Sequence, residues 1–178
     1  MRSLATYFDE GIELALTLAN SVSNARQGAP VIPKEPPASP DDPNVAHLCS
    51  RLRAALDAPG LAEASDILNG LLRNAAAAPA LSADANGRWG LHLHSTNADA
   101  VAKMTVKAAA SLAALIDDDT WTSLKRCSAD RCDDYYLDQS RNQSRRYCSV
   151  ACANRVNAQR HRKRQSAATT TTTRHDTQ

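Results

Sequence analysis

Four of the five cysteines lie within 26 residues in the last third of the 178-residue chain, and they form two pairs. The first pair is Cys127-x4-Cys132, the second is Cys148-x3-Cys152, and fifteen residues separate the pairs. Such a pair lets one tight turn direct two sulfur atoms at one point, and an excursion of about 12 to 20 residues returns the chain to complete a tetrahedron. The spacing therefore predicts one structural Zn²⁺ ion bound by four thiolates.

The cysteines also leave other chemistries open. Free thiols, a redox-active disulfide and an iron–sulfur cluster are alternatives to zinc, although a reducing compartment disfavours disulfides. A catalytic zinc is not expected, because four cysteine ligands leave no coordination position for water or substrate. The fifth cysteine, Cys49, lies far upstream and is expected to be a small buried side chain on a helix.

The residues around the cysteine pairs predict a hairpin followed by a helix. Residues 135–137 favour a strand, DQSRNQS favours a turn, and residues 145–147 are predicted to return as the second arm. Ser149 is expected to cap a helix over SVACANRVNAQRHRKR, with Cys152 in its first turns, where the helix dipole stabilises a thiolate. A turn, a hairpin and a helix around one zinc resemble a treble-clef finger in outline.

Apolar residues at helical spacing predict four helices upstream of the cysteines. They are expected at residues 9–23, 44–57, 61–77 and 97–116. Asn44 and Asn97 are expected to cap the second and fourth helices, and Pro79 to close the third. The core face predicted for the fourth helix consists of Val101, Met104, Thr105, Ala108, Leu112 and Leu115.

Three further segments have other patterns. GRWGLHLHS, residues 87–95, alternates with a period of two and predicts a short strand or hairpin arm. Its His92 and His94 are attributed to a half-exposed strand, because no nearby acidic residue or cysteine completes a metal site. Residues 28–43 contain six of the eight prolines and predict a loop, and the low-complexity residues 166–178 predict a disordered tail.

These elements predict a mainly α chain of two domains. Residues 1–118 are expected to form a helical domain that contains the Pro-rich loop, and residues 119–165 a small treble-clef-like zinc module made of a β-hairpin and a basic helix. Because the module is too small to bury a core, its folding is expected to depend on the metal. We expect chelation to unfold the module and to leave the helical domain largely intact.

The net charge of +2 conceals an asymmetric distribution. Residues 1–124 carry 9 Lys/Arg against 14 Asp/Glu, whereas residues 125–165 carry 11 Lys/Arg against 4 Asp. A basic end on an acidic body suits an acidic partner, of which nucleic acid is the commonest. The sequence has no stretch of about 18 apolar residues and no clear secretory signal, so we expect a cytoplasmic protein without a membrane span.

The stretch DQSRNQSRRYCSVACANRVNAQRHRKR resembles the CGNR zinc finger, whose hallmark is Cys-Gly-Asn-Arg at the last ligand. Here this stretch is Cys152-Ala153-Asn154-Arg155, and alanine suits a helical position. In that family a helical ABATE domain precedes the finger, and GIELALTLANS near the start of this chain is consistent with one. The family is regarded as bacterial stress-induced transcription regulators, so the resemblance implies zinc and DNA binding.

Basic and polar residues around the last two cysteines are the candidates for contacts with nucleic acid, through phosphates or guanine edges. Asn154 and Arg155 have an alternative role, because they are also placed to brace the zinc turn. The full candidate set is Arg141, Arg145, Arg146, Asn154, Arg155, Arg160, Arg162, Lys163 and Arg164.

The leading hypothesis is a DNA-binding transcription regulator whose helical domain senses a small-molecule effector or forms a homodimer. A protein-interaction module in which zinc only staples the hairpin to the helix is the first alternative. RNA binding is the second, with bases stacked on Tyr135, Tyr136 and Tyr147, although these side chains also suit hairpin packing. No nucleophile motif, phosphate-binding loop or catalytic carboxylate pair is present, so an enzyme is not expected.

Overall fold

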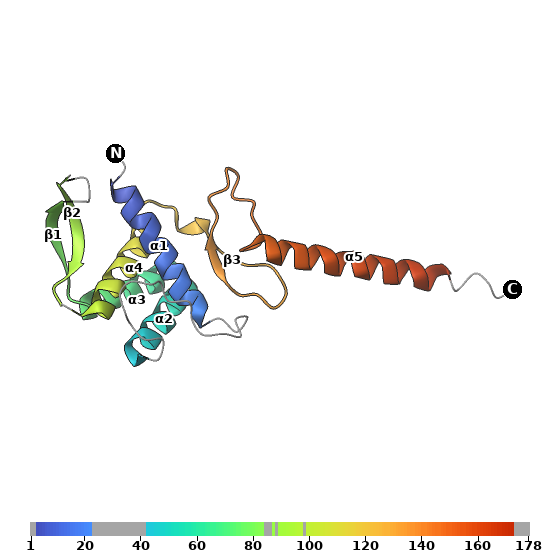
Figure 1. Cartoon of the computed structure of the whole chain (residues 1–178), viewed down its shortest axis with the longest axis horizontal. Helices are drawn as coiled ribbons and strands as arrows, with labels where there is room; N and C mark the ends of the chain where they lie inside the picture. Colours follow the sequence, from blue (N-terminus) through green and yellow to red (C-terminus); the bar gives the residue numbers. More distant parts are fainter. Residues whose placement is uncertain (1–2, 23–41, 84–86, 88, 98, 173–178) are drawn as a thin grey trace.

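The computed structural model describes residues 3–22, 42–83, 87, 89–97 and 99–172. Most elements in these residues are helical, as predicted, and two short strand pairs accompany them. Four helices pack together and a fifth projects away from them (Figure 1). The helices are α1 (Ser3–Ser21), α2 (Pro43–Leu56), α3 (Leu61–Asn74), α4 (Ala100–Asp117) and α5 (Val150–Thr172).

Helix α4 lies at the centre of the helical domain and contacts α1, α2 and α3. All six residues of its predicted core face are buried. Gly11 of α1 lies so close to α4 that an added Cβ would come within 1.9 Å of Ser111 Oγ. Helix α1 adds Ile12, Ala15, Leu18 and Ala19 to the same core. Burial of these apolar faces, at about 25 cal/mol per Å², is what holds the four helices together.

The caps of α2 and α4 differ from the prediction. Asp42 caps α2 by accepting a hydrogen bond from the Asn44 backbone N–H at 2.8 Å. Pro43 then occupies the first helical position, where its missing N–H costs nothing. Asp99 caps α4 by accepting from the Ala102 N–H at 3.1 Å. Both predictions, Asn44 and Asn97, were therefore wrong by two residues.

The predicted strand around residues 87–95 is β2 (Trp89–Ser95), and its partner is β1 (Ala77–Ala83). The strands are antiparallel, with Leu81 opposite Leu91 and Pro79 opposite Leu93. Pro79 therefore lies in a strand rather than after a helix. Helix α3 ends at Asn74 and the chain turns at Ala76, which has a φ of 50°, so the predicted helical end at residue 77 was wrong.

A second strand pair begins the C-terminal module. After a 3-10 turn, η1 (Trp121–Ser123), strand β3 (Leu124–Arg126) pairs antiparallel with β4 (Tyr135–Leu137). The strand at residues 135–137 was predicted correctly, but its partner was not. Residues 145–147 form no strand, and they are held instead by hydrogen bonds from Ser128 N–H and Tyr136 Oη to the carbonyl oxygens of Arg146 and Arg145.

Strand β4 is shared between two apolar cores. Tyr135 and Leu137 pack against the core of the helical domain, together with Trp121 and Leu124. Tyr136 points the other way and is buried among the cysteines. Successive side chains of a strand point to opposite faces, so three residues are enough to join the two cores. The module is therefore docked on the helical domain and is not a tethered finger.

Polar contacts reinforce this docking. Buried Asn20 of α1 accepts a hydrogen bond from the Tyr135 N–H at 2.8 Å and donates one to the Tyr135 carbonyl at 2.9 Å. Arg53 of α2 binds Asp133, the residue after Cys132, at 3.1 Å, and its guanidinium lies 4.9 Å from the centre of the Tyr135 ring. Burial and the Asp57 carboxylate raise the pKa of Tyr135 to about 12, so the phenol stays protonated and donates to Asp57 at 2.8 Å.

Two of the predicted segments extend beyond the described residues. Residues 28–41 of the Pro-rich loop lie outside them, as do residues 173–178 of the tail. Residues 166–172 belong to α5, which continues past the point where the tail was predicted to begin. None of the described helices combines the length and the hydropathy needed to cross a bilayer.

The Asn20→Ala variant tests the docking. Loss of the Asn20 amide leaves the Tyr135 N–H and carbonyl without their partners, so we expect the free energy of unfolding to fall by about 1–3 kcal/mol. The urea midpoint of the zinc-loaded chain measures this change. The exposed Ser50→Ala is the control and is expected to change stability by less than about 0.5 kcal/mol. Equal midpoints for Asn20→Ala and wild type would contradict the docking.

Candidate metal centre

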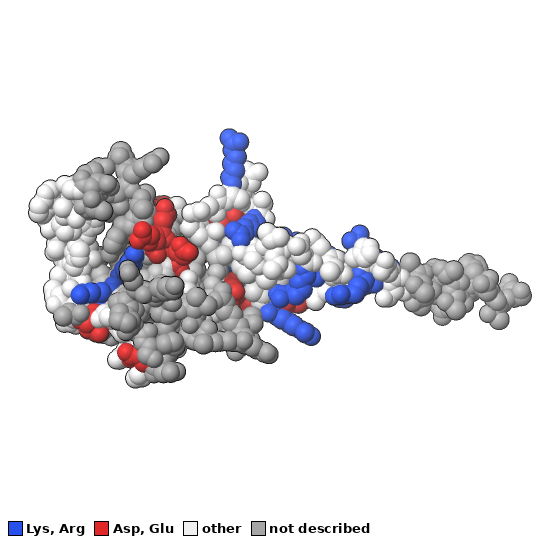
Figure 2. Space-filling model, in the orientation of Figure 1, with Lys and Arg blue, Asp and Glu red and all other residues white. Residues whose placement is uncertain are grey.

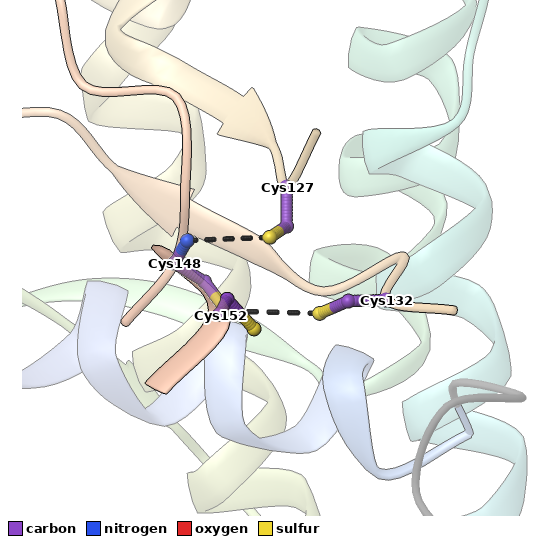
Figure 3. Close-up of side chains that lie close together, drawn as sticks. All are labelled: Cys127, Cys132, Cys148 and Cys152. Atoms are coloured by element: carbon purple, nitrogen blue, oxygen red, sulfur yellow. Dashed lines mark hydrogen bonds between the residues drawn. The ribbon is translucent and has the colours of Figure 1, made fainter. Parts of the chain in front are cut away.

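The four paired cysteines converge on one point. Their sulfur atoms all lie within 4.8 Å of one another. Cys132 Sγ is 3.7 Å from Cys148 Sγ, which is 3.6 Å from Cys152 Sγ (Figure 3). A tetrahedral zinc with Zn–S bonds of about 2.3 Å requires sulfur–sulfur edges of about 3.8 Å. The geometry therefore fits one structural zinc ion.

The same distances decide among the alternatives for the cysteines. All five cysteines are free thiols in the structure, and the sulfur–sulfur separations of 3.6 and 3.7 Å exceed the disulfide bond length of about 2.05 Å. Four sulfurs within 4.8 Å leave room for a single metal ion but not for a cluster of several irons. Cys49 is buried in the core of the helical domain, as expected, and is not part of the centre.

Each cysteine pair is positioned by its own turn. Between Cys127 and Cys132 the chain reverses at Arg131, which has a φ of 63°, and the Cys132 N–H donates to the Ala129 carbonyl at 3.0 Å. Ala129 is buried beneath this turn. The Cys148 N–H donates to Cys127 Sγ at 3.4 Å, so the second turn is bonded directly to a sulfur of the first.

Ser149 caps α5, as predicted. Its Oγ accepts a hydrogen bond from the Cys152 N–H at 3.2 Å, and its carbonyl accepts from the Ala153 N–H at 3.2 Å. Cys152 thus lies in the first turn of α5, where unpaired N–H groups and the helix dipole favour a thiolate. Ala153, which replaces the glycine of the CGNR hallmark, takes an ordinary helical position.

Burial and mutual proximity set the protonation of the thiols. Burial raises the pKa of Cys132 to about 11 and raises the pKa of Cys148 as well. Burial also opposes ionisation of Cys152, but hydrogen bonds with Ser149 and with the neighbouring cysteines lower its pKa. Four thiols this close cannot all ionise unless a cation balances their charge. A divalent ion supplies that charge, and its binding releases protons.

Buried Asp138 organises the connection between the two cysteine pairs. One carboxylate oxygen accepts from Lys125 Nζ at 2.8 Å and from the Arg145 N–H at 3.0 Å, and the other accepts from the Ser140 N–H at 3.0 Å and Oγ at 2.6 Å. The Lys125 ammonium and these donors hold the pKa of Asp138 well below its usual range. Asp138 therefore stays ionised and fixes the start of the segment that leads to Cys148.

Two of the predicted nucleic-acid contacts are engaged within the module. Arg145 donates to the carbonyls of Tyr147, at 2.8 Å, and Cys148, and its guanidinium stacks 5.0 Å from the centre of the Tyr136 ring. Arg155 donates to Cys152 Sγ at 3.4 Å. Hydrogen bonds of this kind orient metal ligands from the second shell of the site. Bracing the zinc turn was the alternative role considered for Arg155, and the structure provides it.

The other predicted contacts point to solvent. Arg141 and Arg146 lie on the exposed connection between β4 and the second cysteine pair. The remaining candidates are exposed residues of α5, namely Asn154, Arg160, Arg162, Lys163 and Arg164. Figure 2 shows Lys and Arg side chains along α5 and the module, and a group of Asp and Glu side chains on the helical domain, which also carries some Lys and Arg.

The residues that dock the centre on the helical domain were not predicted from the sequence. Asn20 and Arg53 lie on helices far upstream in the sequence, and Asp133 was counted only as a charge. The single signal available was a polar residue, Asn20, next to the apolar stripe of the first helix. Tyr136 is buried in the zinc core, and the partly buried Tyr147 and Tyr135 pack against the zinc core and the helical core, so packing is the role that the structure shows for the three tyrosines.

The comparison with known families agrees with this geometry. Residues 123–165 match the model of the CGNR zinc finger. The match begins at the end of η1 and covers β3, β4, all four cysteines and the first part of α5. No curated protein sequence matches the chain.

Replacement of a ligand tests the centre, and the fifth cysteine provides the matched control. Cys148→Ser is expected to lose the single zinc that metal analysis finds in the wild-type chain, whereas Cys49→Ala keeps it. Because Tyr135 and Leu137 of β4 also pack on the helical core, we now expect zinc loss to lower the melting temperature of the helical domain too. One zinc per chain in Cys148→Ser, or none in Cys49→Ala, would contradict the assignment.

Proposed function

We propose that this chain is a DNA-binding transcription regulator in which a zinc-stapled module presents the basic helix α5 to the duplex. The observation that carries the proposal is the charge of that helix. Residues 150–172 contain five Lys/Arg and no Asp or Glu. All five cations are exposed. The summed field of such a helix attracts the phosphate backbone, which is the main source of affinity for nucleic acid.

The position of α5 supports the same proposal. Within residues 150–166, where the structure describes burial, only the first turns of α5 are covered, since Cys152 and Val156 are the buried residues there. Beyond them α5 projects from the body (Figure 1), so its basic part is accessible from several sides. The acidic side chains lie mainly on the helical domain (Figure 2). Their repulsion by the DNA phosphates would turn that domain away from the duplex. The match to the CGNR zinc finger is consistent with this role.

Fluorescence anisotropy with a random DNA duplex tests the proposal. Each phosphate contact contributes about −0.9 to the slope of log K against log salt, so the five cations predict a slope of up to about −4.5. The double variant Arg160→Gln/Arg164→Gln is expected to bind more weakly and to reduce the magnitude of the slope by about 2. Lys103→Gln on α4, also an exposed cation, is the control and should leave both quantities unchanged.

The same assay separates the alternatives. If a chelator removes the zinc and DNA binding is lost with it, the result supports a regulator whose helix α5 is held in place by the metal. Absence of duplex binding at low salt in the zinc-loaded chain would contradict the proposal and leave a protein-interaction module. Tighter binding to single-stranded RNA than to duplex DNA would favour the RNA-binding alternative.

We further propose that the helical domain is ABATE-like and forms a homodimer through the β1–β2 hairpin. Leu81, Trp89 and Leu91 are 70%, 75% and 62% exposed, and by their cross-strand register they lie on one face of the hairpin. Neither strand contains Asp, Glu, Lys or Arg. An apolar, uncharged face is where two otherwise acidic bodies can meet without repulsion.

Light scattering tests this second proposal. The wild-type chain is expected to have the mass of two chains, and Leu81→Ser/Leu91→Ser the mass of one, because the substitutions place hydroxyl groups at the centre of the apolar face. Leu61→Ser is the control, since Leu61 is also exposed but lies on α3. A wild-type monomer at the highest soluble concentration would contradict dimerisation.

A further inference from the structure

The face of α5 opposite the zinc core has a composition of its own. A helix turns by about 100° per residue. Measured from Arg155, the buried Cys152 and Val156 lie at about 60° and 100°. After the exposed Val150, which starts the helix at about 220°, five more exposed residues lie on the opposite side, between about 200° and 300°. These residues, which we call the amide ridge, are Asn154, Asn157, Ala158, His161 and Gln165.

Cations flank the amide ridge on both sides. Arg155 and Arg162 lie at about 0° and 340°, next to one border of the ridge. Arg160 and Arg164 lie at about 140° and 180°, next to the other border, whereas Lys163, at about 80°, lies on the side of the zinc core and belongs to neither row. The ridge itself contains no Lys or Arg. A helix that only needed a positive field would not require this separation of two cationic rows by an uncharged strip.

Duplex DNA has a matching arrangement. An α-helix, about 10–12 Å in diameter, fits the major groove, which is about 12 Å wide, and two phosphate backbones border the groove. If the amide ridge faces the floor of the groove, the two arginine rows face the two backbones. Side-chain amides pair with adenine N6 and N7, and an alanine methyl packs against the thymine methyl. The A-form major groove of RNA is too narrow for such a helix.

We propose that the amide ridge of α5 reads base edges in the DNA major groove, with a preference for A·T pairs, while the arginines on either side hold the phosphates. This inference rests on the proposed DNA-binding function and deepens it. From Asn154 to Gln165 the helix rises about 16 Å, so the ridge covers at most roughly five base pairs. The zinc core lies against the opposite face and leaves the ridge accessible.

Selection from a library of duplexes with a randomised centre, using the full zinc-loaded chain, tests the ridge. The wild-type chain is expected to enrich a short motif that contains A·T pairs. Asn154→Ala is expected to keep its zinc and its helix, because alanine is the better helix former. It should bind random duplex with the wild-type salt slope but lose about 5- to 100-fold of its discrimination at one base position.

Arg164→Ala is the matched variant from a flanking row. It should enrich the wild-type motif while its affinity falls for all duplexes and the magnitude of its salt slope falls by about 1. The inference is overturned if the wild type binds duplexes without enrichment, or if Asn154→Ala keeps the full wild-type preference. Those outcomes leave the proposed function standing. An absence of duplex binding at low salt removes the function and the inference together.

Discussion

Four cysteine sulfurs that lie within 4.8 Å of one another are the constraint on which the rest of the module depends. The buried apolar residues of the module are few, namely Cys127, Ala129, Tyr136, Cys152 and Val156. Two of these five are themselves zinc ligands, so the apolar core alone is too small to hold β3, β4 and α5 together. Zinc supplies the missing free energy, and its four bonds join the turn after β3 to the first turn of α5.

The docking of β4 extends this constraint beyond the module. Because Tyr135 and Leu137 belong to one core and Tyr136 to the other, a strand held in place by zinc is also held by α1 and α2. Asn20 satisfies the backbone of Tyr135 from the side of the helical domain. A change in the packing of α1 or α2 would therefore move Tyr135, and with it the neighbouring Tyr136 in the zinc core. This is a physical route by which an event at the helical domain can alter how α5 is presented.

The sequence predicted those features that depend on local chemistry. Cysteine spacing predicted the centre, because two short turns must bring two sulfurs each to the same metal. The Ser149 cap and the buried face of α4 followed from helical rules that operate over one or two turns. The family match at residues 123–165 agrees with the resemblance drawn from the same residues.

Features that depend on distant partners were not predictable in this way. Tyr135–Leu137 has strand propensity, but propensity does not specify a partner, and the choice of β3 over residues 145–147 depends on where the cysteines close the loop. Asp42 and Asn44 are equally good caps in isolation, and Pro43 at the first helical position decides between them. Pro79 was predicted to stop a helix, whereas the left-handed turn at Ala76 had already ended it.

One zinc ion bound by all four paired cysteines holds the module in this form. X-ray absorption at the zinc edge of the purified chain tests it most directly, because the spectrum reports both the number of sulfur ligands and their distances. We expect four sulfurs at about 2.3 Å and no nitrogen or oxygen ligand. A site with fewer than four sulfurs, or with an open position filled by water or histidine, would contradict it.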